Sequence, residues 1–141
     1  MPMGPTPLAF GYYTGIKAIG YTAAAIGLNR IYENNRASSI KVGLVRTGIG
    51  VGVGVSYGIA WFFIADKLHI NGDAASIAFM TPLFPIRLVE WGLLIKIFYD
   101  GQLSNRSRLW KCSIAGTVWS YCLDAIGIAA AWVLPGGIWV C

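Results

Sequence analysis

The chain has 141 residues, of which 56% are hydrophobic and 12% are charged, with a formal net charge of +5. An ordinary soluble domain has about 25% charged residues, so a chain of this length and composition would expose more apolar surface than water tolerates. Its basic residues are scattered singly, which argues against the dense basic patch that binds nucleic acid. We therefore predict one polytopic membrane domain over residues 1–141, in contact with the lipid bilayer and without a nucleic-acid partner.

Four apolar stretches follow one another along the chain, each close to the roughly 20 residues that a helix needs to cross about 30 Å of hydrocarbon. They predict transmembrane helices at about residues 8–28, 42–65, 74–99 and 112–134. Lys17 interrupts the first stretch, the second is the most uniformly apolar, and the third contains Pro82 and Pro85, which bend a helix. Since short polar segments separate the stretches, the predicted fold class is an all-α integral membrane protein with about four helices in a small bundle.

Small residues recur at helical spacing on three of these stretches, and such faces are typical of lipid-embedded helices that pack by close backbone approach. The face predicted on the second stretch comprises Gly43, Thr47, Gly50, Gly54 and Gly58. Gly48 and Gly52 form a second pair on a neighbouring face. The faces of the first and fourth stretches comprise Gly11, Gly15, Ala18, Thr22 and Ala25, and Gly116, Ser120, Asp124, Gly127 and Ala131. These faces serve either packing within the chain or docking of a protein partner or a second copy.

Four ionisable residues lie well inside the predicted helices, away from their ends, where a charge at the bilayer centre costs at least about 2.5 kcal/mol. They are Lys17, Arg87, Glu90 and Asp124. Arg87 and Glu90 share one helix face, and Asp124 is expected at similar depth because a short loop makes consecutive helices antiparallel neighbours. We expect a buried cluster in which two cations and two anions neutralise one another. The cluster either fixes the register of the helices or forms a path for a proton, an ion or a polar substrate.

Basic residues distinguish the predicted loops from one another. The first loop and its flanks hold Arg30, Arg36, Lys41 and Arg46. The third loop holds Arg106, Arg108 and Lys111. The second loop has only Lys67, and neither terminus has a basic residue. Because cytoplasmic loops retain Lys and Arg, the first and third loops are predicted to be cytoplasmic and both termini non-cytoplasmic.

Catalytic and metal-binding motifs are lacking in the sequence. The single histidine, His69, has Asp66 and Asp73 nearby, but their spacing matches no metal-ligand set. The three cysteines show no C-x-x-C spacing, and no nucleophile motif of a lipid-acting membrane enzyme is present. We therefore predict no catalytic residue, no metal and no cofactor.

Two functions are favoured on these observations, and a membrane enzyme that acts on lipid stays open as a lesser third alternative. The favoured one is a non-catalytic subunit or assembly component of a membrane complex, hetero-oligomeric or homo-oligomeric. The alternative is a small oligomeric transporter or channel component that uses the charged cluster to move a proton, an ion or a polar substrate.

Overall fold

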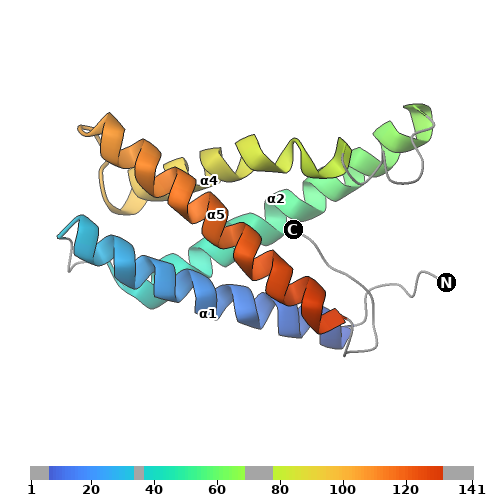
Figure 1. The fold of residues 1–141 in the computed structure, drawn as a ribbon, viewed down its shortest axis with the longest axis horizontal. Coiled ribbons are helices and arrows are strands. Elements are labelled where there is room, and N and C mark those ends of the chain that lie inside the picture. The colour runs from blue at the N-terminus through green and yellow to red at the C-terminus, as the bar shows by residue number, and fades with distance from the viewer. Residues whose placement is uncertain (1–6, 34–36, 69–77, 132–141) are drawn as a thin grey trace.

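A computed structural model describes residues 7–33, 37–68 and 78–131 of the protein. Within these ranges the chain is helical and contains no strand. Its long helices are α1 (Pro7–Ile31), α2 (Ser39–Leu68), α4 (Leu83–Phe98) and α5 (Arg106–Ala131) (Figure 1). The prediction of an all-helical chain with four long helices is confirmed for this part of the protein.

The helices extend further into the predicted loops than the sequence indicates. α2 continues to Leu68, and α5 begins at Arg106, so the basic residues of the third loop lie on the first turns of α5. Several predicted features lie outside the described residues, namely both termini with their orientation, the start of the third span at 74–77 and the end of the fourth at 132–134.

A turn at Thr81 and Pro82 separates the helical residues 78–80 from α4. Pro82 stands at the N-cap of α4 with φ −70°, and Pro85 lies in the first turn, where the backbone N–H groups have no partner within the helix. The two prolines therefore mark the beginning of α4 and leave its middle regular. The 16 residues of α4 measure about 24 Å.

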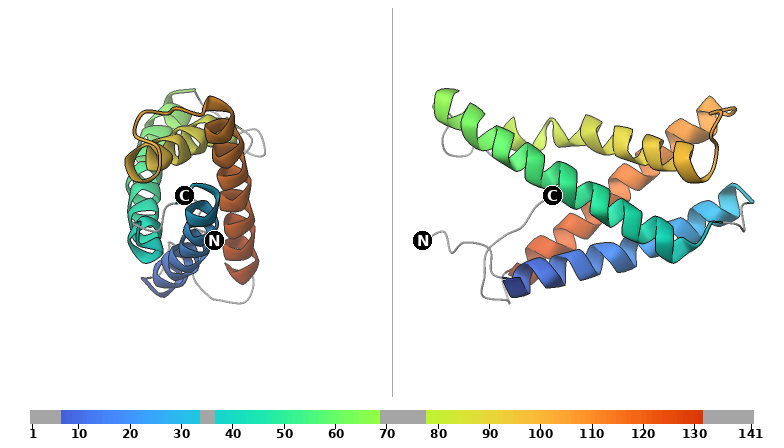
Figure 2. Two further views of the ribbon diagram at one scale, coloured as in Figure 1. Left: turned by 90° about the vertical axis from the view of Figure 1, so that its left-hand side faces the viewer. Right: turned by 180° about the vertical axis from the view of Figure 1, so that it is seen from behind.

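Successive helices run antiparallel, and in end view they form a ring in the order α1, α2, α4, α5 (Figure 2, left). α1 packs most extensively on α2 and α4 on α5, with smaller interfaces between α1 and α5 and between α2 and α4. The α1–α2 and α4–α5 connections lie at one end of the bundle (Figure 1). Toward the other end, α2 with the start of α4 diverges from α1 with the end of α5 (Figures 1 and 2).

The apolar core lies in the half of the bundle near the two connections. Trp91, Leu94 and Ile95 of α4 are almost fully buried and cluster with Tyr21 and Ala25 of α1. The rings of Tyr21 and Trp91 meet edge to face with centroids 5.8 Å apart, a favoured geometry for aromatic pairs. This core fixes α4 against α1 and positions the polar side chains described below.

Aromatic and polar contacts join the two connections to each other. The rings of Tyr32 and Tyr99 lie 5.4 Å apart, and the guanidinium of Arg108 lies 5.5 Å from the Tyr32 ring. The Tyr99 hydroxyl donates to the carbonyl of Ala25 at 3.3 Å. Asn105 caps α5, because its side-chain oxygen accepts the N–H of Arg108 at 2.9 Å. These contacts hold the ends of α1 and α4 and the start of α5 together at the same end of the bundle.

Two segments are long and apolar enough to cross a membrane by length and composition, Ser39–Leu68 and Ala78–Phe98. Among the described residues α1 and α5 do not meet this criterion. Glycine, tyrosine and Lys17 dilute α1, while α5 begins with three basic residues and carries Asp124. Of the four transmembrane helices that the sequence predicts, the second and the third therefore meet the criterion among the described residues.

Candidate functional site: a buried ionic network

Some of the charged side chains lie inside the bundle. Among the described residues five are between 1% and 7% exposed, namely Lys17, Arg46, Arg87, Glu90 and Asp124. Every one of the four long helices contributes at least one of them. A charge removed from water is stable only when it is paired and hydrogen-bonded. We call these five residues the buried ionic network.

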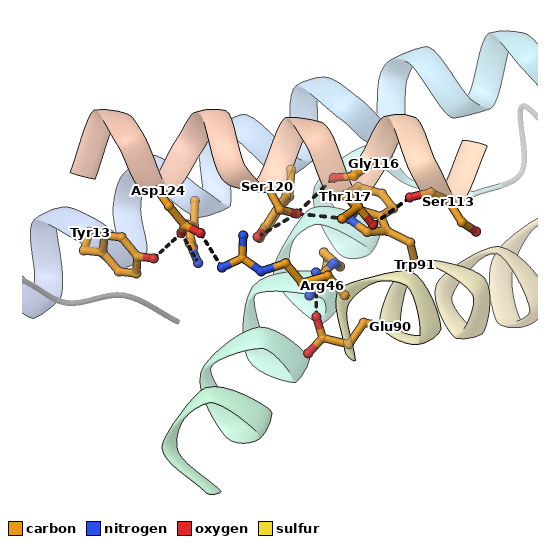
Figure 3. A network of polar contacts seen from close by, with 12 residues as sticks. Tyr13, Arg46, Glu90, Trp91, Ser113, Gly116, Thr117, Ser120 and Asp124 are labelled. Carbon is orange, nitrogen blue, oxygen red and sulfur yellow. Dashed lines mark hydrogen bonds and ion pairs between the residues drawn. The ribbon is translucent and has the colours of Figure 1, made fainter. Parts of the chain in front are cut away.

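Asp124 of α5 is the centre of one half of the network. Its Oδ1 lies 2.9 Å from Lys17 Nζ of α1 and also accepts the hydroxyl of Tyr13, while its Oδ2 pairs with Arg87 Nη2 of α4. Figure 3 shows Tyr13 and Asp124 facing each other across the two helices. Gly127 provides the space for Tyr13, since a Cβ there would lie 2.6 Å from the ring. One carboxylate therefore connects three helices.

Arg46 and Glu90 form the other half of the network. Arg46 Nη2 of α2 lies 2.7 Å from Glu90 Oε2 of α4 (Figure 3). The Arg46 guanidinium also lies 4.8 Å from the ring centroid of Tyr21 and 5.1 Å from that of Trp91. Aromatic faces attract a cation at these distances. The pair joins α2 to α4, so that the network as a whole touches all four long helices.

A polar face of α5 lies between the two halves. The Oγ of Ser120 accepts the indole N–H of Trp91 at 3.0 Å and the hydroxyl of Tyr21 at 3.3 Å, and it donates to the carbonyl of Gly116 at 3.0 Å (Figure 3). Gly116 is required where it stands, because a Cβ at this position would overlap the Trp91 ring. These hydrogen bonds fix the indole beside which Arg46 lies.

Positive charge exceeds negative charge inside the bundle. With all groups ionised, the described network has three cations, Lys17, Arg46 and Arg87, against the two carboxylates Glu90 and Asp124. Arg46 Nε, Arg46 Nη1 and Arg87 Nη1 are buried and hydrogen-bond to no group among the described residues. A buried donor without an acceptor costs about 1 to 3 kcal/mol. Aromatic rings lie beside both guanidinium groups, with Arg87 4.3 Å from the ring centroid of Tyr121, but these N–H groups have no oxygen acceptor among the described residues.

The structure places three of the four predicted cluster residues together and the fourth elsewhere. Lys17, Arg87 and Asp124 meet at one carboxylate. Glu90 lies on the same helix face as Arg87 but pairs with Arg46. The predicted balance of two cations and two anions is thus changed by a fifth charge that the sequence analysis assigns to a loop flank.

Arg46 is the residue of the buried ionic network that sequence reasoning misses. It counts as a flank of the first loop when the second span is drawn from Val42, but α2 begins at Ser39 and turns Arg46 inward. The spacing of Arg46 from its neighbours could have indicated its burial, because the buried residues of α2 lie on one helical face. They are Val42, Gly43, Arg46 and Thr47.

The predicted packing face of α2 is used unevenly. Gly43 and Thr47 are buried, and a Cβ at Gly43 would lie 2.8 Å from the backbone nitrogen of Thr22 on α1. Gly50 lies beside Arg46, because a Cβ at Gly50 would stand 3.2 Å from the guanidinium Nη1 of Arg46. A Cβ at Gly58 would meet nothing within 4 Å. Close helix approach among the described residues is therefore concentrated near the start of α2.

The small-residue faces of α1 and α5 differ in the same way. On α5, Gly116 and Gly127 each admit an aromatic ring. On α1, a Cβ at Gly11 or Gly15 would meet nothing within 4 Å. Close approach on α1 occurs at Thr22 of the predicted face, which lies against Gly43 of α2, and at Gly20 outside that face, where a Cβ would overlap the side chain of the α5 residue Leu123.

Two ionisable groups near the connections have shifted pKa values. Burial raises the pKa of Tyr32 to about 12. The backbone N–H of Ser104, followed by that of Asn105 and the Ser104 hydroxyl, donates to the exposed carboxylate of Asp100 and lowers its pKa. Asp100 therefore remains negative and holds the turn that leads into α5.

Potential metal ligands are dispersed in the part of the chain that the structure describes. No group of three or more His, Cys, Asp or Glu side chains there could hold a metal ion. His69 and Asp73, which the sequence brings near Asp66, lie outside the described residues.

No protein-family model matches the chain, and no curated protein or solved structure compared with it is similar. Function is therefore argued from the buried ionic network and from the surface around it.

Proposed function

We propose that the protein is a multi-pass membrane protein that acts as a non-catalytic subunit or assembly component of a membrane complex. The observation that carries this proposal is the distribution of polarity, in which ionised side chains lie in the interior and large apolar side chains face outward. In water this distribution is unfavourable, because burying the charged groups and exposing the large apolar side chains both cost free energy. In a bilayer, lipid covers the apolar surface and the intramembrane charges pair with one another.

The outward surface is apolar on each long helix. Ile19 of α1 is 74% exposed, Phe62 of α2 is 71% exposed and Val89 of α4 is 70% exposed. On α2 the exposed large apolar side chains are Ile40, Leu44, Val55, Ile59, Phe62, Phe63, Ile64 and Leu68. A soluble monomer rarely exposes contiguous apolar patches larger than a few hundred Å². Lipid or a neighbouring membrane helix is the surrounding that suits these side chains.

Exposed basic residues support an orientation for the bundle. At the end where the two connections meet, the exposed basic residues are Arg30, Lys41, Lys96, Arg106, Arg108 and Lys111. At the opposite end of α2, Lys67 is accompanied by Asp66. By the retention of Lys and Arg on the cytoplasmic side, the end with the connections faces the cytoplasm. A chain that crosses four times then has both termini on the non-cytoplasmic side.

A strip of small residues on α2 supports the role as a subunit. Gly48, Gly52 and Ser56 recur at intervals of four and are exposed. A Cβ at Gly48 or Gly52 would meet nothing within 4 Å, so this strip is not used by the described helices of the chain itself. Small residues at this spacing allow a second membrane helix to approach closely. The occupant is a helix of a protein partner or of a second copy.

The test is the mass of the protein released from its own membrane in nanodiscs. We expect a defined complex, with a stoichiometric partner or a second copy, and we expect Gly52→Leu to release the monomer because the added side chain fills the strip. Val55→Leu, which enlarges an exposed side chain on the same helix, is the control and should preserve the complex. A wild-type monomer, or equal behaviour of the two variants, would contradict the proposed docking strip.

A second candidate function is the movement of a proton, an ion or a polar substrate. The excess of cations and the unpaired guanidinium N–H groups inside the bundle favour it, because intramembrane charges commonly mark transport pathways. Glu90→Gln in reconstituted vesicles should then abolish flux while leaving assembly intact. Absence of wild-type flux for protons and common ions would remove this candidate.

A further inference from the structure

A small cavity lies between α2 and α4, beside the two arginines of the network. Its volume is about 10 Å³, which matches one particle of the size of a water molecule. Polar groups and backbone line one part of it, and Val53, Gly54 and Ile86 contribute to the apolar part. The other residues that line the cavity are Tyr21, Arg46, Gly50, Leu83, Arg87 and Glu90.

Both arginines that line this cavity have unused N–H donors. Arg46 is 1% exposed and Arg87 is 3% exposed, and both line the cavity. Arg46 uses Nη2 for Glu90, whereas its Nη1 lies toward Gly50, at 3.2 Å from where a Cβ would stand. Arg46 Nε, Arg46 Nη1 and Arg87 Nη1 have no acceptor among the described residues. Two cations with unused N–H donors therefore line a space that holds one small particle.

We propose that this cavity binds a small monovalent anion of halide size, held by the guanidinium groups of Arg46 and Arg87. An anion there accepts from the unused N–H groups, and hydrogen bonds to charged donors are about twice as strong as neutral ones. It also supplies the missing negative charge, because the described network then has three cations and three anions.

Other occupants satisfy these observations less well. A water molecule accepts from the N–H groups but leaves the excess positive charge uncompensated in a region of low dielectric constant, where charge interactions are strong. A metal cation adds to the excess of positive charge and meets one carboxylate, that of Glu90, against two guanidinium groups. Phosphate and sulfate each have five heavy atoms, which do not fit a cavity that holds one particle. The proposal depends on these contacts alone and does not depend on the membrane orientation or on a protein partner.

The experiment is a halide titration of the purified full-length chain in detergent, at constant ionic strength, with gluconate as the replacement anion. A ligand that binds the folded state raises the unfolding midpoint with its concentration. We expect chloride and bromide to raise the thermal midpoint with a saturable dependence, and sulfate to give only the non-saturating rise that a salt excluded from the protein surface produces. A wild-type midpoint that is the same in gluconate and chloride would overturn the proposal, since it would mean that water alone occupies the cavity.

Gly50→Ala places a methyl group next to Arg46 Nη1 and fills the cavity, whereas Gly58→Ala adds the same methyl group to the same helix where nothing lies within 4 Å. We expect the apparent chloride affinity of Gly50→Ala to fall at least about ten-fold, equivalent to 1.4 kcal/mol, and that of Gly58→Ala to equal the wild-type value. Equal chloride responses of the two variants would show that halide acts elsewhere and would overturn the assignment.

Arg87→Lys provides a second variant if Gly50→Ala does not fold. It keeps the positive charge that faces Asp124 but removes the planar fork of N–H donors. A clear loss of chloride affinity at unchanged helix content supports the site. A wild-type response would contradict the role given to the Arg87 guanidinium.

Discussion

Replacing Asp124 with asparagine should destabilise the fold more than any other change of a single carboxylate in the described chain. The substitution preserves shape and removes one charge. In the wild type this carboxylate meets Lys17 at 2.9 Å, pairs with Arg87 and accepts the hydroxyl of Tyr13. In the variant, both cations lose their anion while remaining buried at 3% exposure.

The size of the effect follows from the number of charges left alone. Breaking one buried ion pair by removing a partner costs about 3 to 5 kcal/mol, and Asp124 is shared by two pairs. The described network goes from an excess of one positive charge to an excess of two, with Glu90 as its remaining anion. We therefore expect a loss of at least about 3 to 5 kcal/mol, a large part of the 5 to 15 kcal/mol that stabilises a typical domain.

The assay is reversible unfolding of the purified chain in mixed micelles with increasing denaturing detergent, followed by far-ultraviolet circular dichroism. Asp66→Asn is the control, because Asp66 is exposed at the end of α2 and should unfold like the wild type. Arg87→Gln combined with Asp124→Asn should recover part of the stability, and addition of Lys17→Gln should recover more. An Asp124→Asn variant as stable as the Asp66→Asn control would refute this account of the network.

Two further predictions concern packing and pH. Gly116→Ala should lower stability by about 1 to 3 kcal/mol in the same assay, because the methyl group overlaps the ring of Trp91, whereas Gly92→Ala places its methyl group at an ordinary 3.9 Å from the nearest atom and should be tolerated. Because the pKa of Tyr32 rises to about 12 on folding, its stabilising contribution is complete below pH 10 and is lost as the pH rises toward 12. Tyr32→Phe should therefore reduce the fall in thermal midpoint over this range, and an unchanged fall would contradict the assignment.

The sequence predicts the four helices because long apolar stretches are a local property of the chain. It also predicts that Arg87, Glu90 and Asp124 lie at helix positions where a charge needs a partner. It does not predict which partner each residue has, because that depends on how each helix is rotated about its axis. Arg46 is the example. It stands near the start of the predicted second span, where the sequence indicates a loop flank, but α2 begins three residues earlier and Arg46 faces inward, where it pairs with Glu90.

The small residues show the same limit of prediction from the sequence, which does not tell which residues touch across helices. Their spacing predicts smooth helix faces, yet the glycines that touch a neighbour are set by side chains on other helices. Gly20, which belongs to no predicted face, lies against Leu123, whereas Gly15 of the predicted face meets nothing within 4 Å. A glycine pattern thus indicates where helices are able to approach, and the large residues opposite decide where they do.

The measurement that tests the central claim most directly is thiol accessibility in intact cells, in a background from which the three native cysteines have been removed. The claim is that the chain spans the membrane with both described connections on the cytoplasmic side. An impermeant thiol reagent added outside should label Leu68→Cys, at the far end of α2, and should label Glu33→Cys and Ser104→Cys only after the membrane is opened. Labelling of Glu33→Cys and Leu68→Cys from the same side, or recovery of the chain in the soluble fraction, would contradict the account.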